Sequence, residues 1–314
     1  MFRFWTAALL VYFVVAVPLM AQQRTRTKGG SYTTPPGTTT ITSFDKDHDV
    51  VGWLEIVPFE SKIFHNTRML RVLVPANYFS PYNAHRTYPV LYMQDGQELF
   101  DAATSPNGEW QMDDTIEHLV GGFKIPPMFV VGIDNAGQQR SAEYLPYPDA
   151  NNKNASDEKS VHGKEYARFL LTEVMPFIEK HYRVSRGARN TGLGGSSYGG
   201  DITLYTALEH PSVFGHVLVE SPQLWIGNDQ LLKDAQKAKV LPQKLYIGIG
   251  TNEAYDDPQL GPQAVQQVQE LDKILLKKGM GVSRLKVVVE QGGQHDQAAW
   301  SRRLPGALLF LYGE

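Results

Sequence analysis

Cysteine is absent from the sequence. This absence excludes a disulfide framework, a thiolate zinc site, a lipidated N-terminal cysteine and a cysteine nucleophile. An excess of one charge is also absent, because 30 basic and 33 acidic residues leave a formal net charge of −3. The chain therefore has no general attraction to nucleic acid or to anionic membranes, and we expect no nucleic-acid partner.

Long hydrophobic runs are lacking outside the N-terminus, where an apolar stretch covers residues 4–17. Pro18 breaks this stretch, and Ala21 precedes two glutamines. The stretch is short for a bilayer span of about 20 residues, and its layout is typical of a secretory signal peptide. We interpret residues 1–21 as a signal peptide, with an uncleaved anchor as the alternative. Cleavage after Ala21 predicts an exported protein, periplasmic or extracellular, without stable membrane insertion.

Large apolar residues are scarce in the next segment, which is rich in Thr, Gly and Pro. Such a segment buries too little surface to offset its ordering entropy, so we predict a flexible linker at residues 22–44. No second boundary follows, and residues 45–314 are long enough for a single domain with a large core.

Short apolar runs alternate with longer amphipathic stretches along this domain. The predicted strands are 49–59, 67–75, 88–94, 127–133, 190–195, 216–220, 244–250 and 284–290. The predicted helices are 110–120, 163–181, 199–210, 262–279 and 297–311. This alternation predicts an α/β fold with a mostly parallel central sheet of about eight strands and helices on both faces.

The stretch GLGGSSYGGD, residues 192–201, allows three interpretations. A triphosphate-binding loop requires lysine after its last glycine, but Asp201 follows Gly200. A dinucleotide-binding loop, as in an oxidoreductase, requires a third glycine where Ser197 stands. The segment 195–199 matches the third pattern, G-x-S-x-G, between a predicted strand and a predicted helix. That turn exposes a serine to a neighbouring base, although a serine that merely caps the helix has the same local sequence.

Two later loops supply partners for Ser197 in the chain order of serine hydrolases. Glu253 follows the predicted strand 244–250, and His295 lies in the glycine-flanked loop after the next strand. His295 is the candidate general base, and Glu253 is the candidate acid that orients it. Asp256 and Asp257 are alternatives for the acid.

Two backbone N–H groups are candidates for an oxyanion hole. One belongs to Tyr198, which follows the candidate nucleophile. The other belongs to Gln97, because the preceding Asp95-Gly96 pair allows a sharp turn after the strand 88–94.

Several segments together resemble the putative esterase family of the α/β-hydrolase superfamily. They are VLYMQDGQELF, GIDNAGQQRSAEYLPY, LLTEVMPFIEKHYRV, GGSSYGG, GTNE and GGQHDQAAWSRRLPGAL. This family includes siderophore, feruloyl and acetyl-xylan esterases, S-formylglutathione hydrolases and mycolyltransferases, and the wording is most similar to siderophore-esterase-like hydrolases.

The resemblance implies an α/β-hydrolase fold and a serine esterase. Ser197, His295 and Glu253 match the catalytic positions, and the N–H groups of Gln97 and Tyr198 match the oxyanion hole. It implies no metal or organic cofactor, and a small-molecule or carbohydrate ester as substrate, such as a siderophore, feruloyl or acetyl-sugar ester. An acyltransferase with the same triad and a non-catalytic binding module are the alternatives.

Three further features of the sequence give expectations about the surroundings of the site. Arg140 and Glu143 are expected to form a structural ion pair. The polar, helix-free segment 146–163 is expected to overhang the site. Three tryptophans are candidates for an acyl pocket or for core packing: Trp110, Trp225 and Trp300.

Overall fold

The computed structural model describes residues 32, 34–150, 152–153, 155–253 and 260–313. The expected signal peptide and most of the expected linker lie outside these residues. Within the described part, no helix has the length and apolar character needed to cross a bilayer.

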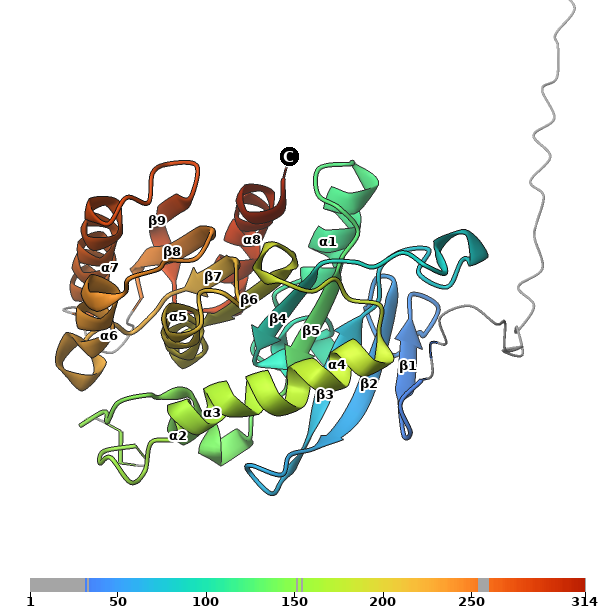
Figure 1. Ribbon diagram of the computed structural model, residues 1–314, viewed down its shortest axis with the longest axis horizontal. Coiled ribbons are helices and arrows are strands. Elements are labelled where there is room, and N and C mark those ends of the chain that lie inside the picture. The colour runs from blue at the N-terminus through green and yellow to red at the C-terminus, as the bar shows by residue number, and fades with distance from the viewer. Residues whose placement is uncertain (1–31, 33, 151, 154, 254–259, 314) are drawn as a thin grey trace, which may run out of the picture. The chain divides into compact units, whose positions relative to one another are not determined.

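The described residues contain a nine-stranded mixed sheet (Figure 1) in the order β1-β2-β3-β5-β4-β6-β7-β8-β9. The strands β4 to β9 are mutually parallel, whereas β1, β2 and β3 pair antiparallel. The bounds are β1 Thr39–Thr42, β2 Trp53–Glu60, β3 Thr67–Leu73, β4 Val90–Gln94, β5 Phe129–Ile133, β6 Thr191–Ser196, β7 His216–Glu220, β8 Lys244–Asn252 and β9 Leu285–Gln294. The predicted fold class, mostly parallel and α/β, is confirmed.

The ninth strand comes from the segment that we expected to be a linker. β1 pairs with β2 in the register Thr39↔Ile56 to Thr42↔Trp53, so the folded part begins before residue 45. The expectation of a linker reaching residue 44 is therefore wrong for this stretch. Its threonines are β-branched and favour extended backbone once a partner strand is available.

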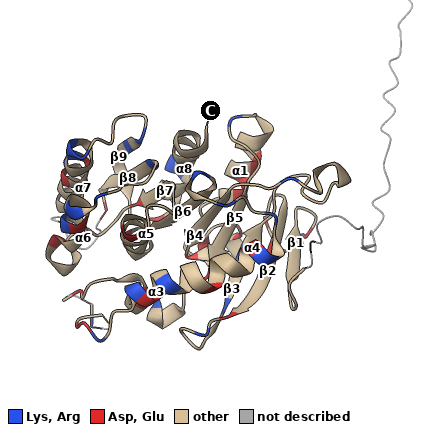
Figure 2. Cartoon of the chain, viewed as in Figure 1, with Lys and Arg blue, Asp and Glu red and all other residues tan. Residues whose placement is uncertain are grey.

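Helices cover both faces of the sheet (Figure 1). Their bounds are α1 Met112–Gly121, α2 Arg140–Tyr144, α3 Gly163–Phe169, α4 Met175–His181, α5 Tyr198–Glu209, α6 Ile226–Lys237, α7 Leu260–Lys277 and α8 Gln297–Tyr312. A single π-helical turn joins α3 to α4, so the predicted helix 163–181 is continuous. The helices α3, α6 and α7 each carry both basic and acidic residues (Figure 2). Charges of both signs are therefore interspersed on these helices.

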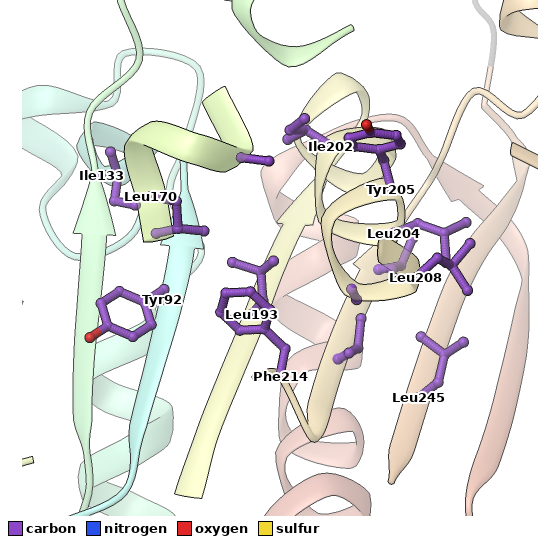
Figure 3. Packing of buried hydrophobic residues seen from close by; sticks show 14 of the residues in the cluster. Tyr92, Ile133, Leu170, Leu193, Ile202, Leu204, Tyr205, Leu208, Phe214 and Leu245 are labelled. Carbon is purple, nitrogen blue, oxygen red and sulfur yellow. The ribbon is translucent and has the colours of Figure 1, made fainter. Parts of the chain in front are cut away.

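Two hydrophobic cores lie on opposite faces of the sheet because neighbouring strand residues point to opposite sides. Along β4, Val90 and Tyr92 join the core beneath α3 to α7, and Leu91 and Met93 join the core beneath α1 and α8. Part of the first core is drawn in Figure 3, where Leu193 of β6 lies beside Phe214, and apolar side chains of α5 belong to the same cluster. This packing fixes α5, and therefore the turn that precedes it, against the centre of the sheet.

Candidate active site

The carboxyl ends of the parallel strands meet at one edge of the sheet, where ligands bind in open α/β sheets. Ser197 directly follows β6, Glu253 directly follows β8, and His295 directly follows β9. The structure thus brings the three predicted residues to the same edge. Asp256 and Asp257, the alternative acids, lie outside the described residues.

Ser197 occupies a strained turn between β6 and α5. Its backbone has φ 57° and ψ −132°, a region that non-glycine residues rarely adopt, at a cost of about 1–3 kcal/mol. The turn is tight because a Cβ atom on Gly195 would lie 2.5 Å from the carbonyl oxygen of Gly199. A Cβ atom on Gly199 would lie 3.0 Å from Oδ2 of Asp95, so glycine at both positions of the G-x-S-x-G motif has a steric reason. The serine stands at the N-terminus of α5.

His295 and Glu253 form a direct pair, with Nδ1 of the imidazole 2.7 Å from Oε2 of the carboxylate. A carboxylate only accepts hydrogen bonds, so the contact assigns the imidazole proton to Nδ1 and leaves Nε2 free to act as a base. The other carboxylate oxygen, Oε1, accepts from the backbone N–H of Gly250 at 2.5 Å and from the Ser221 hydroxyl at 2.8 Å. Both oxygens of Glu253 are thereby held.

The Ser197 hydroxyl accepts a hydrogen bond from Nε2 of Gln223 at 3.2 Å. Within the described part of the chain, no hydrogen bond joins Ser197 to His295. The backbone N–H of Gln223 donates to Oδ1 of Asp201 at 2.8 Å, so the first turn of α5 anchors the loop that carries this glutamine. Burial raises the pKa of Asp201 to about 8, which keeps the carboxyl group protonated at neutral pH.

The two expected oxyanion donors lie in the first turns of helical segments. Tyr198 is the first residue of α5, and Gln97 lies in the 3₁₀ turn Gly96–Glu98. Neither backbone N–H finds an acceptor among the residues that the structure describes. The first N–H groups of a helix lack intrahelical partners, which makes them suitable donors to an anion.

The loop of Gln97 is fixed by an ion pair. Asp95 has a left-handed backbone, φ 55°, and its carboxylate accepts from Nε and Nη2 of Arg140, both at 2.7 Å. Our expectation that Arg140 pairs with Glu143 is wrong: Glu143 instead accepts two hydrogen bonds from the buried Arg68, at 2.8 and 2.9 Å. Arg140 and Glu143 are close in sequence, but their actual partners come from distant segments, namely the loop after β4 and the strand β3.

A cavity of about 140 Å³ lies beside the histidine. Its walls include Pro222, Trp225, Ile249, Ala264, Gln223 and His295. Of the three candidate tryptophans, Trp225 lines this cavity, while Trp110 and Trp300 pack against each other in the core beneath α1 and α8.

The segment 146–163 contacts the first residue of α5, since Asp149 accepts a hydrogen bond from the hydroxyl of Tyr198 at 3.1 Å. Its described residues before α3 form turns and bends, not helices. The described residues hold no group of three or more His, Asp and Glu side chains arranged to bind a metal ion.

Sequence reasoning missed Ser221 and Gln223, which contact Glu253 and Ser197 respectively. The available signal was their position directly after the strand 216–220, whose carboxyl end lies at the same edge as the site. A polar residue just past a parallel strand is a site candidate whether or not it belongs to a motif.

Known proteins resemble this chain in sequence and in fold. The curated relatives include the uncharacterised protein YbbA of Bacillus subtilis, 25% identical over 72% of this chain and 86% of its own length. They also include a siderophore enterobactin esterase of Emericella nidulans, 29% identical over 47% of this chain and 50% of its own. Among solved structures, a ferulic acid esterase of Anaeromyces mucronatus has a TM-score of 0.60 at 20% identity, covering 90% of this chain and 94% of its own.

The structural likeness shows the α/β-hydrolase fold. The family model described as "Putative esterase" matches residues 61–311, which include the strained serine turn, the histidine loop and most of the sheet. The chain therefore belongs to the putative esterase family and is an esterase of the α/β-hydrolase superfamily.

Proposed function

We propose that the protein hydrolyses carboxylic esters through an acyl-enzyme on Ser197, with His295 as general base and Glu253 as the acid that orients it. The observation that carries the proposal is the strained serine turn at the N-terminus of α5, at the same sheet edge as the His295–Glu253 pair. Strain of this kind persists where the surrounding packing imposes it, and it gathers at active sites.

In the acylation step, the Ser197 hydroxyl exchanges its hydrogen bond from Gln223 for one to Nε2 of His295. Oγ attacks the ester carbonyl carbon while its proton passes to Nε2. The bond between the carbonyl carbon and the alcohol oxygen then breaks, and the leaving alcohol takes the proton from the imidazolium. Glu253 stabilises the imidazolium through the hydrogen bond at Nδ1.

Water completes the cycle. It gives a proton to His295, attacks the acyl carbon and releases the carboxylic acid, and Ser197 regains its proton. In both steps the N–H groups of Gln97 and Tyr198 donate to the carbonyl oxygen as it gains negative charge. The loss of one such donor typically lowers kcat by about 10²–10³-fold.

Labelling with a fluorophosphonate, followed by peptide mass mapping, tests the nucleophile. We expect an adduct on Ser197 that is absent in Ser197→Ala and forms far more slowly in His295→Ala. Ser196→Ala is the matched control, because this neighbouring serine is also buried and its variant should label normally. An adduct that persists in Ser197→Ala, or folded wild-type protein that does not label, would contradict the proposal.

For the substrate we propose a small-molecule or carbohydrate ester with an uncharged acyl group, since the cavity offers apolar walls and the neutral amide of Gln223. Feruloyl, siderophore and acetyl-sugar esters form the assay panel, and the names of two similar proteins also suggest the first two. Acid release is measured against Ser197→Ala. Added acceptor alcohol then separates the two reaction types, because an acyltransferase would form the acceptor ester as its main product.

A further inference from the structure

We infer that Ser221 and Trp300 are positioning residues, which together hold the Glu253 carboxylate in the orientation that binds His295. The inference rests on the proposed triad and identifies the groups that fix its acid. Among the described residues, neither is hydrogen-bonded to the Ser197 hydroxyl or to Nε2 of His295, so both would act through Glu253 and the orientation of His295.

A directional chain of hydrogen bonds carries the inference. The indole N–H of Trp300 donates to the Ser221 hydroxyl at 2.9 Å, and that hydroxyl lies 2.8 Å from Oε1 of Glu253. An indole N–H can only donate and an ionised carboxylate can only accept. The Ser221 proton therefore has a single destination, the carboxylate, and the direction of each bond is fixed.

These hydrogen bonds fix the orientation of the Glu253 carboxylate. Oε1 takes two donors, from Ser221 and from the backbone of Gly250, and Oε2 takes the His295 proton. These hydrogen bonds are largely shielded from bulk water, because Ser221 is 1%, Trp300 4% and Glu253 9% exposed. Removal of the hydroxyl would leave a buried carboxylate oxygen one donor short and the indole N–H without an acceptor.

Two further contacts support a role beyond packing. Ser221 has φ 46°, a conformation unfavourable for any residue with a side chain, and its backbone N–H is held by the carbonyl of Gly248 at 2.8 Å. The Trp300 ring also meets the His295 ring edge-to-face, with centroids 5.4 Å apart. Trp300 therefore contacts the imidazole directly and its carboxylate partner through Ser221.

The experiment measures ester turnover and the downfield NMR resonance of the proton between His295 and Glu253. In Ser221→Ala and Trp300→Phe we expect kcat to fall about 10- to 100-fold with KM little changed, because the first change removes a hydrogen bond to the Glu253 carboxylate and the second removes the donor that orients the Ser221 hydroxyl. We expect the resonance to move upfield or disappear. Ser221→Gly relieves the strained backbone, so it should be more stable than Ser221→Ala yet equally impaired in kcat.

Ser61→Ala is the matched control. Ser61 is likewise 1% exposed, and its hydroxyl donates to a glutamate, Glu173, at 2.8 Å in the region of the β2–β3 turn. Its loss should lower stability without changing kcat or the resonance. Wild-type kcat and resonance in Ser221→Ala would overturn the inference. An active Ser197→Ala would instead overturn the proposed function, while the resonance would still report whether Ser221 positions Glu253.

Discussion

Asp201 lies in the first turn of α5, 1% exposed, and burial raises its pKa from 3.8 to about 8. Its Oδ1 accepts from the backbone of Gln223, and its Oδ2 has no hydrogen-bond partner among the described residues. Between these two pKa values the native state keeps a proton that the unfolded chain has released. The free energy of unfolding must therefore fall by about 1.4 kcal/mol for each pH unit in this range.

Asn at this position is nearly isosteric and does not titrate. Relative to wild type, Asp201→Asn should become more stable as the pH rises, by about 4 kcal/mol at pH 7, where the unfolded aspartate lies about 3 units above its own pKa. The gain is lost as the pH falls towards 4, because both states of wild type are then protonated.

Urea unfolding of both proteins across about pH 5 to pH 7 measures this difference, which should widen by about 2.7 kcal/mol over the two units. An effect of the amide on packing that does not change with pH would shift this difference by a constant amount and would not alter its widening. Asp47→Asn, at an exposed position, serves as the control and should show no such trend. A difference between wild type and Asp201→Asn that stays constant with pH would show that Asp201 is ionised in the native state, and the reasoning would fail.

Three further outcomes are expected. In urea unfolding, Gly192→Ala should cost about 1–3 kcal/mol because its Cβ would overlap the Tyr312 hydroxyl, and Tyr312→Phe should restore part of this loss. By the same measurement Arg68→Met should cost about 3–5 kcal/mol, because it leaves Glu143 buried and unpaired. The additional change Glu143→Leu should recover much of that loss, and an equal loss in the single and double variants would contradict this reasoning. Mass spectrometry of the exported protein should find an N-terminus directly after Ala21, and an intact N-terminus would contradict the signal-peptide interpretation.

The predicted fold was most accurate where the pattern is local. The parallel strands are short apolar runs bounded by turn residues, so period and length alone identify them. The helix α6 was missed because its first turn contains Gly227, Asn228 and Asp229, all with φ near 60°, and such residues resemble an ordinary turn. β1 was missed because its identity depends on pairing with β2, a contact that local composition does not contain.

The site likewise has features that the sequence predicts and features that it does not. The order of Ser197, Glu253 and His295 along the chain follows a known topology, so their meeting at one sheet edge was predictable. The partners of Arg140 and Ser221 were not, because Asp95 and Trp300 come from distant parts of the chain and only the folded backbone sets their distances. Hydrogen-bond geometry of this kind has no periodic signal in a sequence.

The contacts of α8 also constrain when the site can form. The chain is synthesised from its N-terminus, so β6 and Ser197 exist long before α8, whose Trp300 binds Ser221 and whose Tyr312 packs against Gly192. His295 arrives with the same late segment. The proposed triad therefore cannot assemble before the segment that carries His295 and α8 has been synthesised. In a chain with the export signal that we expect, this order would delay esterase activity until the segment with His295 and α8 has left the ribosome.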